Sequence, residues 1–176
     1  MTDNTEIELE LTYLAREMPP EIKGIQPVVM EDVYFPDNVS HAQLRARHKG
    51  DKYEITKKQP LKEGDASVQT EQTISLTKPE FEALTLSSTK KVKKLRYNTL
   101  INNYPAEVDV FQDALEGLVL IDFEFETAED KELFKQPEVA LADVTQEEFI
   151  AGGYISGKSY ADIEESLSRY SYARIQ

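Results

Sequence analysis

Glu6-Ile7-Glu8-Leu9-Glu10, near the beginning of the chain, alternates strictly between carboxylates and apolar side chains. In a β-strand this alternation places the three glutamates on one face and Ile7 and Leu9 on the other. Carboxylates spaced by roughly 7 Å along one face repel each other unless water or cations lie between them. The row is therefore either the solvated outer face of a half-buried strand or part of a metal site inside a polar channel.

The length and composition are those of a globular chain of about one domain. The chain has 176 residues, of which 40% are hydrophobic and 30% charged, and it has no cysteine. The missing cysteines exclude a disulfide framework, a thiolate zinc site and a cysteine nucleophile. No apolar run approaches the ~20 residues that cross a bilayer, and the acidic N-terminus differs from a signal peptide. We therefore expect a cytoplasmic protein without a membrane partner.

The charge is unevenly distributed along the chain. Its net value of −13 argues against general nucleic-acid binding. Residues 1–40 carry 2 basic and 9 acidic side chains, residues 41–100 carry 13 and 7, and residues 101–176 carry 5 and 17. A cationic middle between acidic flanks suggests that the two signs meet in the fold. They would meet either as surface salt bridges or around a ligand that both signs bind, such as a metal–polyphosphate complex.

The first 127 residues have the pattern of an antiparallel sheet. Runs of strand-forming residues separated by turn signals predict a series of strands, with a helix opening at the capping box Thr77–Glu80 and a loop from Pro60 to Asp65. The expected strands are residues 6–13, 28–35, 42–49, 52–58, 67–76, 90–101, 106–111 and 117–127. About eight strands in meander spacing are enough for the sheet to close into a barrel.

Residues 128–176 are expected to be mainly helical. Three helix-start signatures occur there, at Thr127–Asp130, Thr145–Glu148 and Ser159–Asp162. By contrast, Pro19 and Pro20 limit any helix near residues 15–22 to a short or broken one.

Residues 152–159, Gly-Gly-Tyr-Ile-Ser-Gly-Lys-Ser, match the phosphate-loop pattern GxxxxGK[ST]. That loop needs a buried parallel strand immediately before it, so that backbone N–H groups converge on phosphate. Residues 145–151 are expected to be helical instead, and the 17 residues after Ser159 are too few for the rest of a parallel sheet. We interpret the segment as a glycine-rich turn between helices.

Rows of charged side chains recur on one face of the expected strands, and the opposite faces are mostly apolar. The rows are Glu6, Glu8 and Glu10; Arg45 and Arg47; Lys52, Glu54, Thr56 and Lys58; Gln69 and Glu71; Lys94 and Arg96; Glu107 and Asp109; and Asp122, Glu124 and Glu126. An ordinary barrel would turn the apolar faces inward and leave these charges in water. So many rows of both signs make an inward charged face the alternative, with helices covering an apolar exterior.

With these residues the chain resembles the CYTH proteins, or triphosphate tunnel metalloenzymes, a family named for class IV adenylyl cyclases and thiamine triphosphatases. The matching segments, in order, are Glu6–Glu8, Asp32–Phe35, Leu44–Arg47, Ile55–Lys58, Thr70–Glu71, Lys94–Tyr97, Glu107–Phe111 and Gly117–Glu126. The resemblance implies one α+β domain over residues 1–176. An eight-stranded antiparallel β-barrel with one inserted helix would occupy residues 1–127, with helices packed outside it and a helical C-terminal part at residues 128–176.

The resemblance also implies that the tunnel holds a triphosphate and one or two divalent cations, Mg²⁺ or Mn²⁺. Arginine and lysine suit phosphate oxygens, and carboxylates suit these metals. The implied phosphate binders are Arg45, Arg47, Lys58, Lys94 and Arg96; the implied metal ligands are Glu6, Glu8, Asp122 and Glu124; and supporting candidates are Glu10, Glu71, Asp109 and Glu126. Lys94 would protonate the leaving phosphate, or Arg96 would stabilise its developing charge.

One departure from the family pattern stands in the opening motif. The family motif is ExExK, and Glu10 takes the place of its lysine. The exchange would create another metal ligand, shift the substrate preference, or mark a protein that binds without efficient turnover. The expected function is metal-dependent hydrolysis of inorganic tripolyphosphate or of an organic triphosphate such as thiamine triphosphate.

Three alternatives to hydrolysis stay open at this stage. They are adenylyl cyclase-type activity, non-catalytic binding of polyphosphate or nucleotide, and an acidic β-barrel adaptor whose charged rows face solvent. The expected partner is a small molecule that contains a triphosphate, and the oligomeric state, a homodimer included, is open.

Overall fold

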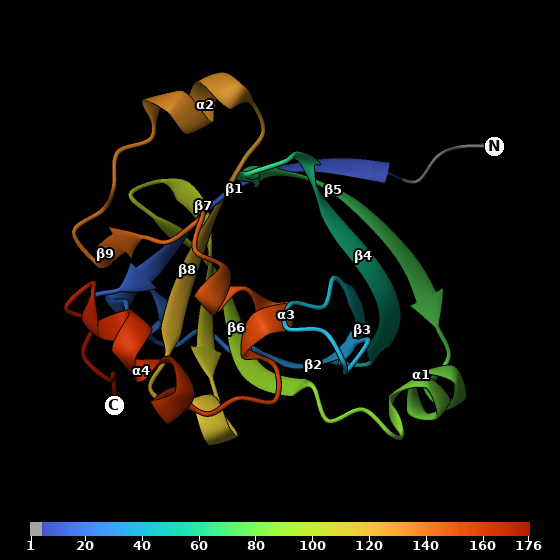
Figure 1. Ribbon diagram of the computed structural model, residues 1–176. Helices are drawn as coiled ribbons and strands as arrows, with labels where there is room; N and C mark the ends of the chain where they lie inside the picture. Colours follow the sequence, from blue (N-terminus) through green and yellow to red (C-terminus); the bar gives the residue numbers. More distant parts are fainter. Residues whose placement is uncertain (1–4) are drawn as a thin grey trace.

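The computed structural model describes residues 5–176, and its centre is a nine-stranded antiparallel sheet (Figure 1). The strands are β1 (Thr5–Ala15), β2 (Val28–Phe35), β3 (Leu44–Lys49), β4 (Lys52–Lys62), β5 (Asp65–Leu76), β6 (Lys91–Ile101), β7 (Tyr104–Phe111), β8 (Val119–Phe125) and β9 (Ala140–Asp143). Their order is β5-β4-β3-β2-β6-β7-β8-β1-β9, with a further pairing of β5 and β1. That pairing closes β1 to β8 into a ring, which confirms the predicted α+β barrel.

The first strand closes the barrel because it pairs with different neighbours along its length. Residues 5–9 pair with β5, residues 9–14 pair with β8, and residues 13–15 pair with β9. On the opposite side of the ring, β2 joins β3 to β6. From β2, the ring therefore continues one way through β3, β4 and β5 and the other way through β6, β7 and β8. The strand β1 completes the ring by pairing with both β5 and β8.

The largest apolar clusters lie outside the barrel wall. On β8, Asp122 faces the interior while Ile121 and Phe123 face outward, and both of these are fully buried. The segment between α2 (Ala128–Leu133) and β9 covers this outer face, because the Phe134 ring packs 4.7 Å from the ring of Phe123. Other segments of the chain therefore cover the apolar outer face of the barrel wall, as predicted for strands whose charged rows face inward.

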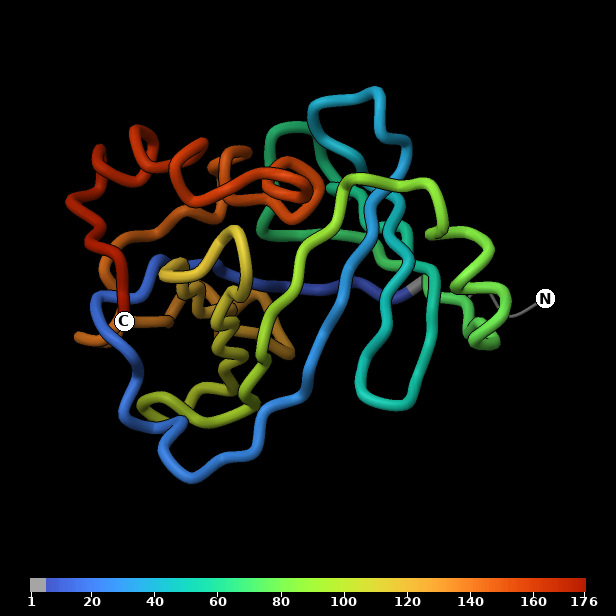
Figure 2. Tube along the Cα trace, turned by 90° about the horizontal axis from the view of Figure 1, so that it is seen from below, coloured from blue at the N-terminus to red at the C-terminus, as the bar shows by residue number. Residues whose placement is uncertain are grey.

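Helices supply cover on two other sides. The helix α1 (Lys78–Thr85), which begins at the predicted capping box, sets Phe81 against Val33 on the outer wall. The helix α4 (Tyr160–Ser168) buries Ile163 and Leu167 against the neighbouring wall. The shorter elements are η1 (Pro20–Ile22), η2 (Asp113–Leu115), η3 (Glu148–Ile150) and α3 (Gly152–Ile155). Figures 1 and 2 both place α4 and the C-terminus on the far side of the barrel from α1.

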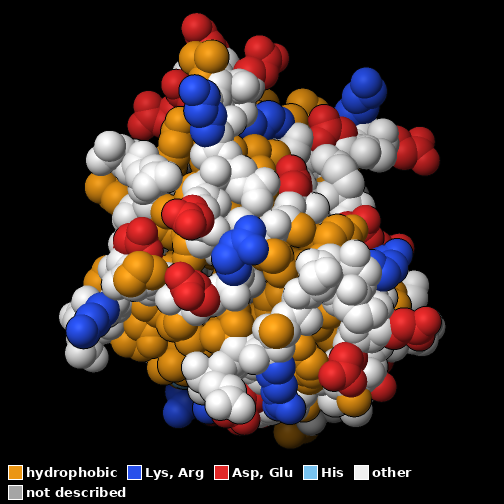
Figure 3. All heavy atoms as spheres, turned by 90° about the vertical axis from the view of Figure 1, so that its left-hand side faces the viewer, with side chains coloured by type: hydrophobic (Ala, Val, Ile, Leu, Met, Phe, Trp, Pro, Cys, Tyr) orange, Lys and Arg blue, Asp and Glu red, His pale blue; other side chains and the backbone are white. Residues whose placement is uncertain are grey.

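The face of the molecule that bears α4 and β9 carries scattered charges (Figure 3). Figure 3 views the side of the molecule that bears α4 and β9, and it shows apolar side chains between scattered acidic and basic ones. Within residues 5–176, no helix is long and apolar enough to cross a membrane.

The predicted loop from Pro60 to Asp65 is wrong. The strand β4 continues to Lys62 and β5 begins at Asp65, so the hairpin turns within two residues. The pairing shifts register between Pro60 and Lys62. Such an irregularity tolerates a proline, which has no N–H to give to the ladder.

The helix predicted to begin at Thr145 is reduced to the single turn η3. The hydroxyl of Thr145 accepts a hydrogen bond from the backbone N–H of Thr12 (3.0 Å) and donates one to the carboxylate of Asp143 (2.6 Å). The side chain thus ties the segment to β1 and does not cap a helix. The nearby residues 140–143, also expected to be helical, form β9 instead.

Replacing Phe123 tests whether the core lies outside the barrel wall. Phe123 is 0% exposed and contacts Tyr13 and Phe134. We expect Phe123→Ala to lower the free energy of unfolding by about 3–5 kcal/mol. The control Leu86→Ala alters a residue that is 85% exposed and should change it by no more than about 0.5 kcal/mol. Denaturant titration measures both values, and equal effects would contradict the assignment.

Candidate functional site

The barrel encloses a cavity of about 590 Å³ whose wall is densely charged. Its carboxylates are Glu6, Glu8, Glu10, Asp32, Glu54, Glu71, Glu107, Asp109, Asp122, Glu124 and Glu147, and its cations are Arg45, Arg47, Lys49, Lys58, Lys94 and Arg96. The charged rows of the sequence therefore face inward. The adaptor hypothesis, in which they would face solvent, does not fit this geometry.

The two signs of charge are concentrated on opposite walls. The acidic row of β1 lies between acidic neighbours, because Glu6 pairs in register with Glu71 of β5 and Glu10 pairs with Glu124 of β8. Across the ring, β2 lies between β3 and β6, which carry five of the six cations. A ligand in the cavity would therefore contact carboxylates on one side and guanidinium or ammonium groups on the other.

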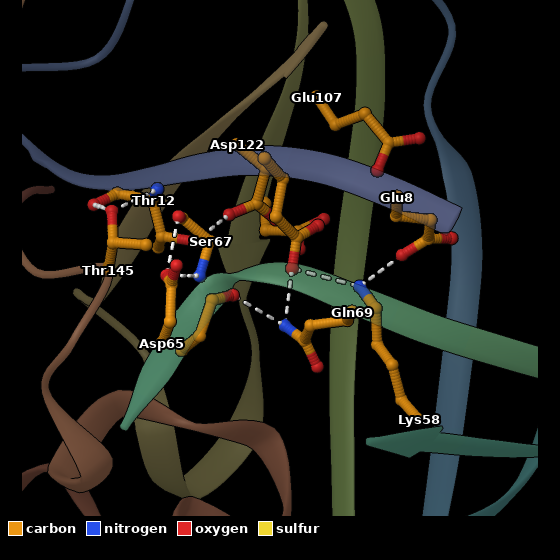
Figure 4. Close-up of polar contacts among 12 residues, drawn as sticks. Glu8, Thr12, Lys58, Asp65, Ser67, Gln69, Glu107, Asp122 and Thr145 are labelled. Atoms are coloured by element: carbon orange, nitrogen blue, oxygen red, sulfur yellow. Dashed lines mark hydrogen bonds and ion pairs between the residues drawn. The ribbon is translucent and has the colours of Figure 1, made fainter. Parts of the chain in front are cut away.

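Lys58 crosses from β4 to the acidic wall. Its Nζ lies 2.5 Å from an oxygen of Glu8 and 2.9 Å from an oxygen of Glu10 (Figure 4). The side-chain amide of Gln69 donates a second hydrogen bond, of 3.0 Å, to the same oxygen of Glu10. Burial lowers the pKa of Lys58, but Glu10 and Glu8 outweigh burial and raise this pKa above its usual value. The ammonium is firmly charged and is shared between two carboxylates, so it offsets one of their two negative charges.

Arg45 and Arg47 share one face of β3 but differ in their partners. Arg47 makes a two-pronged contact with Asp32, with N–O distances of 2.6 and 2.7 Å, and the exposed fractions of these side chains are 7% and 1%. Burial raises the pKa of Asp32, but Arg47 outweighs it and holds this pKa well below its usual range. By contrast, the buried Nε of Arg45 has no hydrogen-bond partner within residues 5–176. Arg45 therefore keeps a donor for a ligand.

Lys94 and Arg96 form a compact cluster with two acids of β7. Arg96 holds Asp109 through two hydrogen bonds of 2.7 and 2.6 Å and also contacts Glu107. Lys94 donates to the same Asp109 carboxylate. Burial, followed by the charge of Arg96, lowers the pKa of Lys94, which makes its ammonium a better proton donor.

Asp122 has a strongly altered acidity. Burial, followed by the nearby charges of Glu10 and Asp109, raises the pKa of Asp122 to about 7. The hydroxyl of Thr12 donates a hydrogen bond of 2.7 Å to this carboxyl group (Figure 4). Burial and the charge of Glu107 also raise the pKa of Glu124. Added cations would relieve the crowding of acids on this wall.

The carboxylates suit a divalent cation in chemistry but do not form a ready-made site. Mg²⁺ and Mn²⁺ bind through carboxylate oxygens and water, and the buried Oε2 of Glu8 accepts no directional hydrogen bond despite its contact with Lys58. Among the described residues, however, no three acidic or histidine side chains converge as metal ligands. Lys58 and Arg96 instead hold oxygens of Glu8, Glu10 and Glu107 in ion pairs.

The cavity brings together most of the side chains implied by the resemblance. All the implied phosphate binders, metal ligands and supporting candidates line it except Glu126, which lies exposed beyond the end of β8. Asp32, Gln69 and Glu107 are partners that the predicted site did not include, although the charged rows that contain Gln69 and Glu107 were recognised. Glu107 could have been identified from the sequence because it shares a strand face with Asp109. Asp32 could have been identified because it alternates with outward-facing residues of β2.

The segment that matches the phosphate-loop pattern does not cradle an anion. A 3₁₀ turn, η3, precedes it, and backbone N–H groups that would bind phosphate are used inside the protein: that of Gly157 donates to Lys91 O (3.0 Å) and that of Ser159 to the Asp162 carboxylate (2.7 Å). The first half of the segment forms the single-turn helix α3, and only its second half is the turn to α4, so the turn predicted between helices is confirmed with its first helix placed at residues 152–155. The segment also helps to line the cavity, and Gly153 approaches the Ala42 carbonyl so closely that a Cβ would lie 1.8 Å from its oxygen.

The family model for the CYTH domain matches residues 4–150, which include every strand of the barrel. The chain belongs to the CYTH family. Its structure is similar to that of the inorganic triphosphatase NE1496, with a TM-score of 0.63 and 22% sequence identity over 86% of this chain and 95% of the other. It is also similar to a putative adenylate cyclase from Bacillus halodurans, with a TM-score of 0.55 and 16% identity over 98% and 94%.

At these identities the structural likeness shows that the CYTH chain has the fold of these proteins and does not specify its reaction. A search of the curated proteins finds no match. The reaction has to be argued from the site itself.

The acidity of Asp122 gives this CYTH protein a testable pH dependence. The folded-state pKa of about 7 lies above the value of about 3.9 for a free aspartate. The folded state therefore binds this proton more tightly, so the stabilisation is present at low pH and is lost as the pH rises through about 7. We expect Asp122→Asn to raise the melting temperature by several degrees at pH 8 and much less at pH 4.

Scanning calorimetry in metal-free buffer at both pH values measures this difference. Asp51→Asn, which removes a carboxylate from the exposed β3–β4 turn, is the matched control and should show no such contrast. A gain of equal size at pH 4 and pH 8 would show that Asp122 does not keep its proton in the folded protein.

Proposed function

We propose that this protein hydrolyses a triphosphate, either inorganic tripolyphosphate or an organic triphosphate such as thiamine triphosphate, with Mg²⁺ or Mn²⁺ in its tunnel. The observation that carries the proposal is the barrel cavity, in which a buried Nε of Arg45 that has no hydrogen-bond partner among residues 5–176 lies opposite a wall of carboxylates. Phosphate oxygens need charged donors, and the cations that accompany polyphosphates need carboxylates. This cavity supplies both.

The basic wall would bind and polarise the phosphates. Arg45 would anchor the chain of phosphates, with Arg47, Lys58, Lys94 and Arg96 adding positive charge around it. Asp109 and Glu107 hold Arg96 in place, so its fork is already oriented before charge develops on the substrate. Lys94 would give its proton to the leaving phosphate, and its lowered pKa favours that transfer.

The acidic wall would hold the cation through Glu6, Glu8, Asp122 and Glu124, supported by Glu10, Glu71 and Asp109. The cation would neutralise charge on the phosphate oxygens and make a bound water more acidic. Glu126, at its exposed position, would act outside this set.

Non-catalytic binding of polyphosphate is the second candidate function. The observation that favours it is that Glu8 and Glu10 engage Lys58, which withdraws one cation from the phosphates. Cyclase chemistry would require contacts to a nucleoside, for which the lining residues suggest no specific set. In either case we expect a cytoplasmic protein that works on a small molecule, without nucleic acid or membrane, as its net charge of −13 suggests.

A phosphate-release screen tests the proposal. Tripolyphosphate, thiamine triphosphate and ATP are each assayed with Mg²⁺, Mn²⁺ or EDTA, and binding is followed in parallel by thermal shift. Metal-dependent release supports hydrolysis, whereas thermal stabilisation without release supports the binder. Neither release nor stabilisation with any of the three compounds would exclude both.

Replacing Arg45 should remove an anchor from the substrate. Loss of a charged hydrogen bond costs about 1.5–3 kcal/mol, so Arg45→Ala should lower kcat/KM about 10- to 100-fold. Lys52→Ala removes a cation from the exposed end of β4 and serves as the control. Steady-state phosphate release measures both, and equal activity of the two variants would remove Arg45 from the binding set.

Replacing Glu10 by lysine tests the departure from the family motif. Glu10→Lys releases Lys58 from one of its two acids and adds two positive charge units to the cavity, so KM for tripolyphosphate should fall several-fold. Glu126→Lys makes the same charge change outside the cavity and controls for overall charge. If the two variants have the same KM as the wild type, Glu10 lies outside the active set.

A further inference from the structure

Lys58 occupies the position between two carboxylates that a divalent cation would otherwise take. Its Nζ contacts Glu8 at 2.5 Å and Glu10 at 2.9 Å, and both glutamates line the cavity. An ammonium and a metal ion compete for the same oxygens, because each needs negative charge in direct contact. The chain's own lysine therefore blocks part of the acidic wall.

The tunnel cations are not equally able to move. Arg96 is fixed by a planar fork that makes two hydrogen bonds to Asp109 and by a further contact with Glu107. Lys58 is held only at the tip of a flexible side chain, which is 26% exposed. Detaching Lys58 breaks two contacts of a single ammonium group and no planar two-bond contact of the kind that fixes Arg96. Lys58 is therefore freer than Arg96 to change partners.

The topology places a second set of partners within reach of Lys58. Its strand, β4, lies between β5, which leads to the acidic wall, and β3, which carries Arg45. Thr56, two residues before Lys58 on the same inner face, pairs in register with Arg45. A phosphate held by Arg45 would therefore lie one strand away from the base of Lys58.

We propose that Lys58 is the exchangeable cation of the tunnel: it pairs with Glu8 and Glu10 in the free protein and moves to phosphate oxygens when a divalent cation takes its place on these carboxylates. The proposal rests on the triphosphate function proposed above. It also gives Glu10 a role, since this additional acid holds Lys58 on the acidic wall until the exchange occurs.

The exchange makes the two ligands depend on each other. A metal ion alone would displace Lys58 and leave its ammonium without an anion, and a polyphosphate alone would draw Lys58 away and leave two adjacent glutamates unpaired. Each of these states contains uncompensated charge in a buried site, which is costly. Of the three liganded states, only the metal–polyphosphate complex pairs Lys58 with an anion and both glutamates with a cation. Metal and polyphosphate should therefore favour each other's binding, and this coupling is reciprocal.

Calorimetric titration of Lys58→Met tests the proposal without relying on turnover. The ligands are Mn²⁺ alone and the equimolar complex of Mn²⁺ with the imido analogue of tripolyphosphate, which resists hydrolysis. Relative to the wild type, the variant should bind Mn²⁺ alone about tenfold or more tightly, because nothing competes for Glu8 and Glu10. It should bind the complex about tenfold or more weakly, because a phosphate contact is missing.

Two further variants make the result unambiguous. Lys57→Met removes the adjacent, exposed lysine on the outer face of the same strand and should leave both affinities at the wild-type values. Lys58→Arg keeps the charge and the fold, and its fork should hold the two glutamates more firmly and weaken the binding of Mn²⁺ alone. If Lys58 had a purely structural role, Lys58→Met would instead bind both ligands more weakly than the wild type.

The outcomes separate this proposal from the function on which it rests. Opposite changes in the two affinities of Lys58→Met support the exchange. Tight binding of the complex by the wild type, with both affinities falling together or unchanged in Lys58→Met, would overturn the exchange and leave the proposed function intact. A wild-type protein that binds neither Mn²⁺ nor the complex would overturn both.

Discussion

The pairing of opposite charges inside a closed barrel is the constraint on which the rest of this structure depends. A buried charge without a partner is strongly destabilising, and this barrel turns many charges inward. The pairs that meet the constraint join different strands: Asp32 on β2 with Arg47 on β3, Asp109 on β7 with Arg96 on β6, and Glu8 and Glu10 on β1 with Lys58 on β4. The contacts that would present the cavity to a ligand therefore also link the strands of its wall.

An inward charged face determines what the rest of the chain must do. The outward faces of the strands are mostly apolar, and the part around β8 that α1 does not cover would be exposed without the segments that follow β8. The segment with Phe134 covers β8, and α4 covers the neighbouring wall with Ile163 and Leu167. The residues after the barrel therefore complete the hydrophobic core from outside, so that the fold has a polar centre and an apolar shell.

The sequence predicts those parts of the fold that depend on local patterns. Alternation gave the strands and assigned the faces of β1 and β8 correctly, and the capping box Thr77–Glu80 gave the start of α1. Local pattern does not determine which distant strands meet, so the closure of β1 on β5 was open. The short strand β9 has no alternation long enough to detect, and the helix signature at Thr145 failed because its hydroxyl found a partner on β1.

The same limit applies to the site, where the residue types could be predicted but not their partners. The spacing Arg45-Ala46-Arg47 placed both arginines on one face, which made them equivalent candidates for binding phosphate. Their difference arises on β2, where Asp32 faces the fork of Arg47, while the Nε of Arg45 has no hydrogen-bond partner in the part of the chain that the structure describes.

Lys58 follows the same logic, since its partner Glu10 is 48 residues away and lies beyond an intervening strand. A charged side chain inside a barrel takes its role from what the ring places within its reach. The glutamate that departs from the family motif therefore has to be judged together with the lysine it holds, because the two form one ion pair whose charge is balanced within the tunnel.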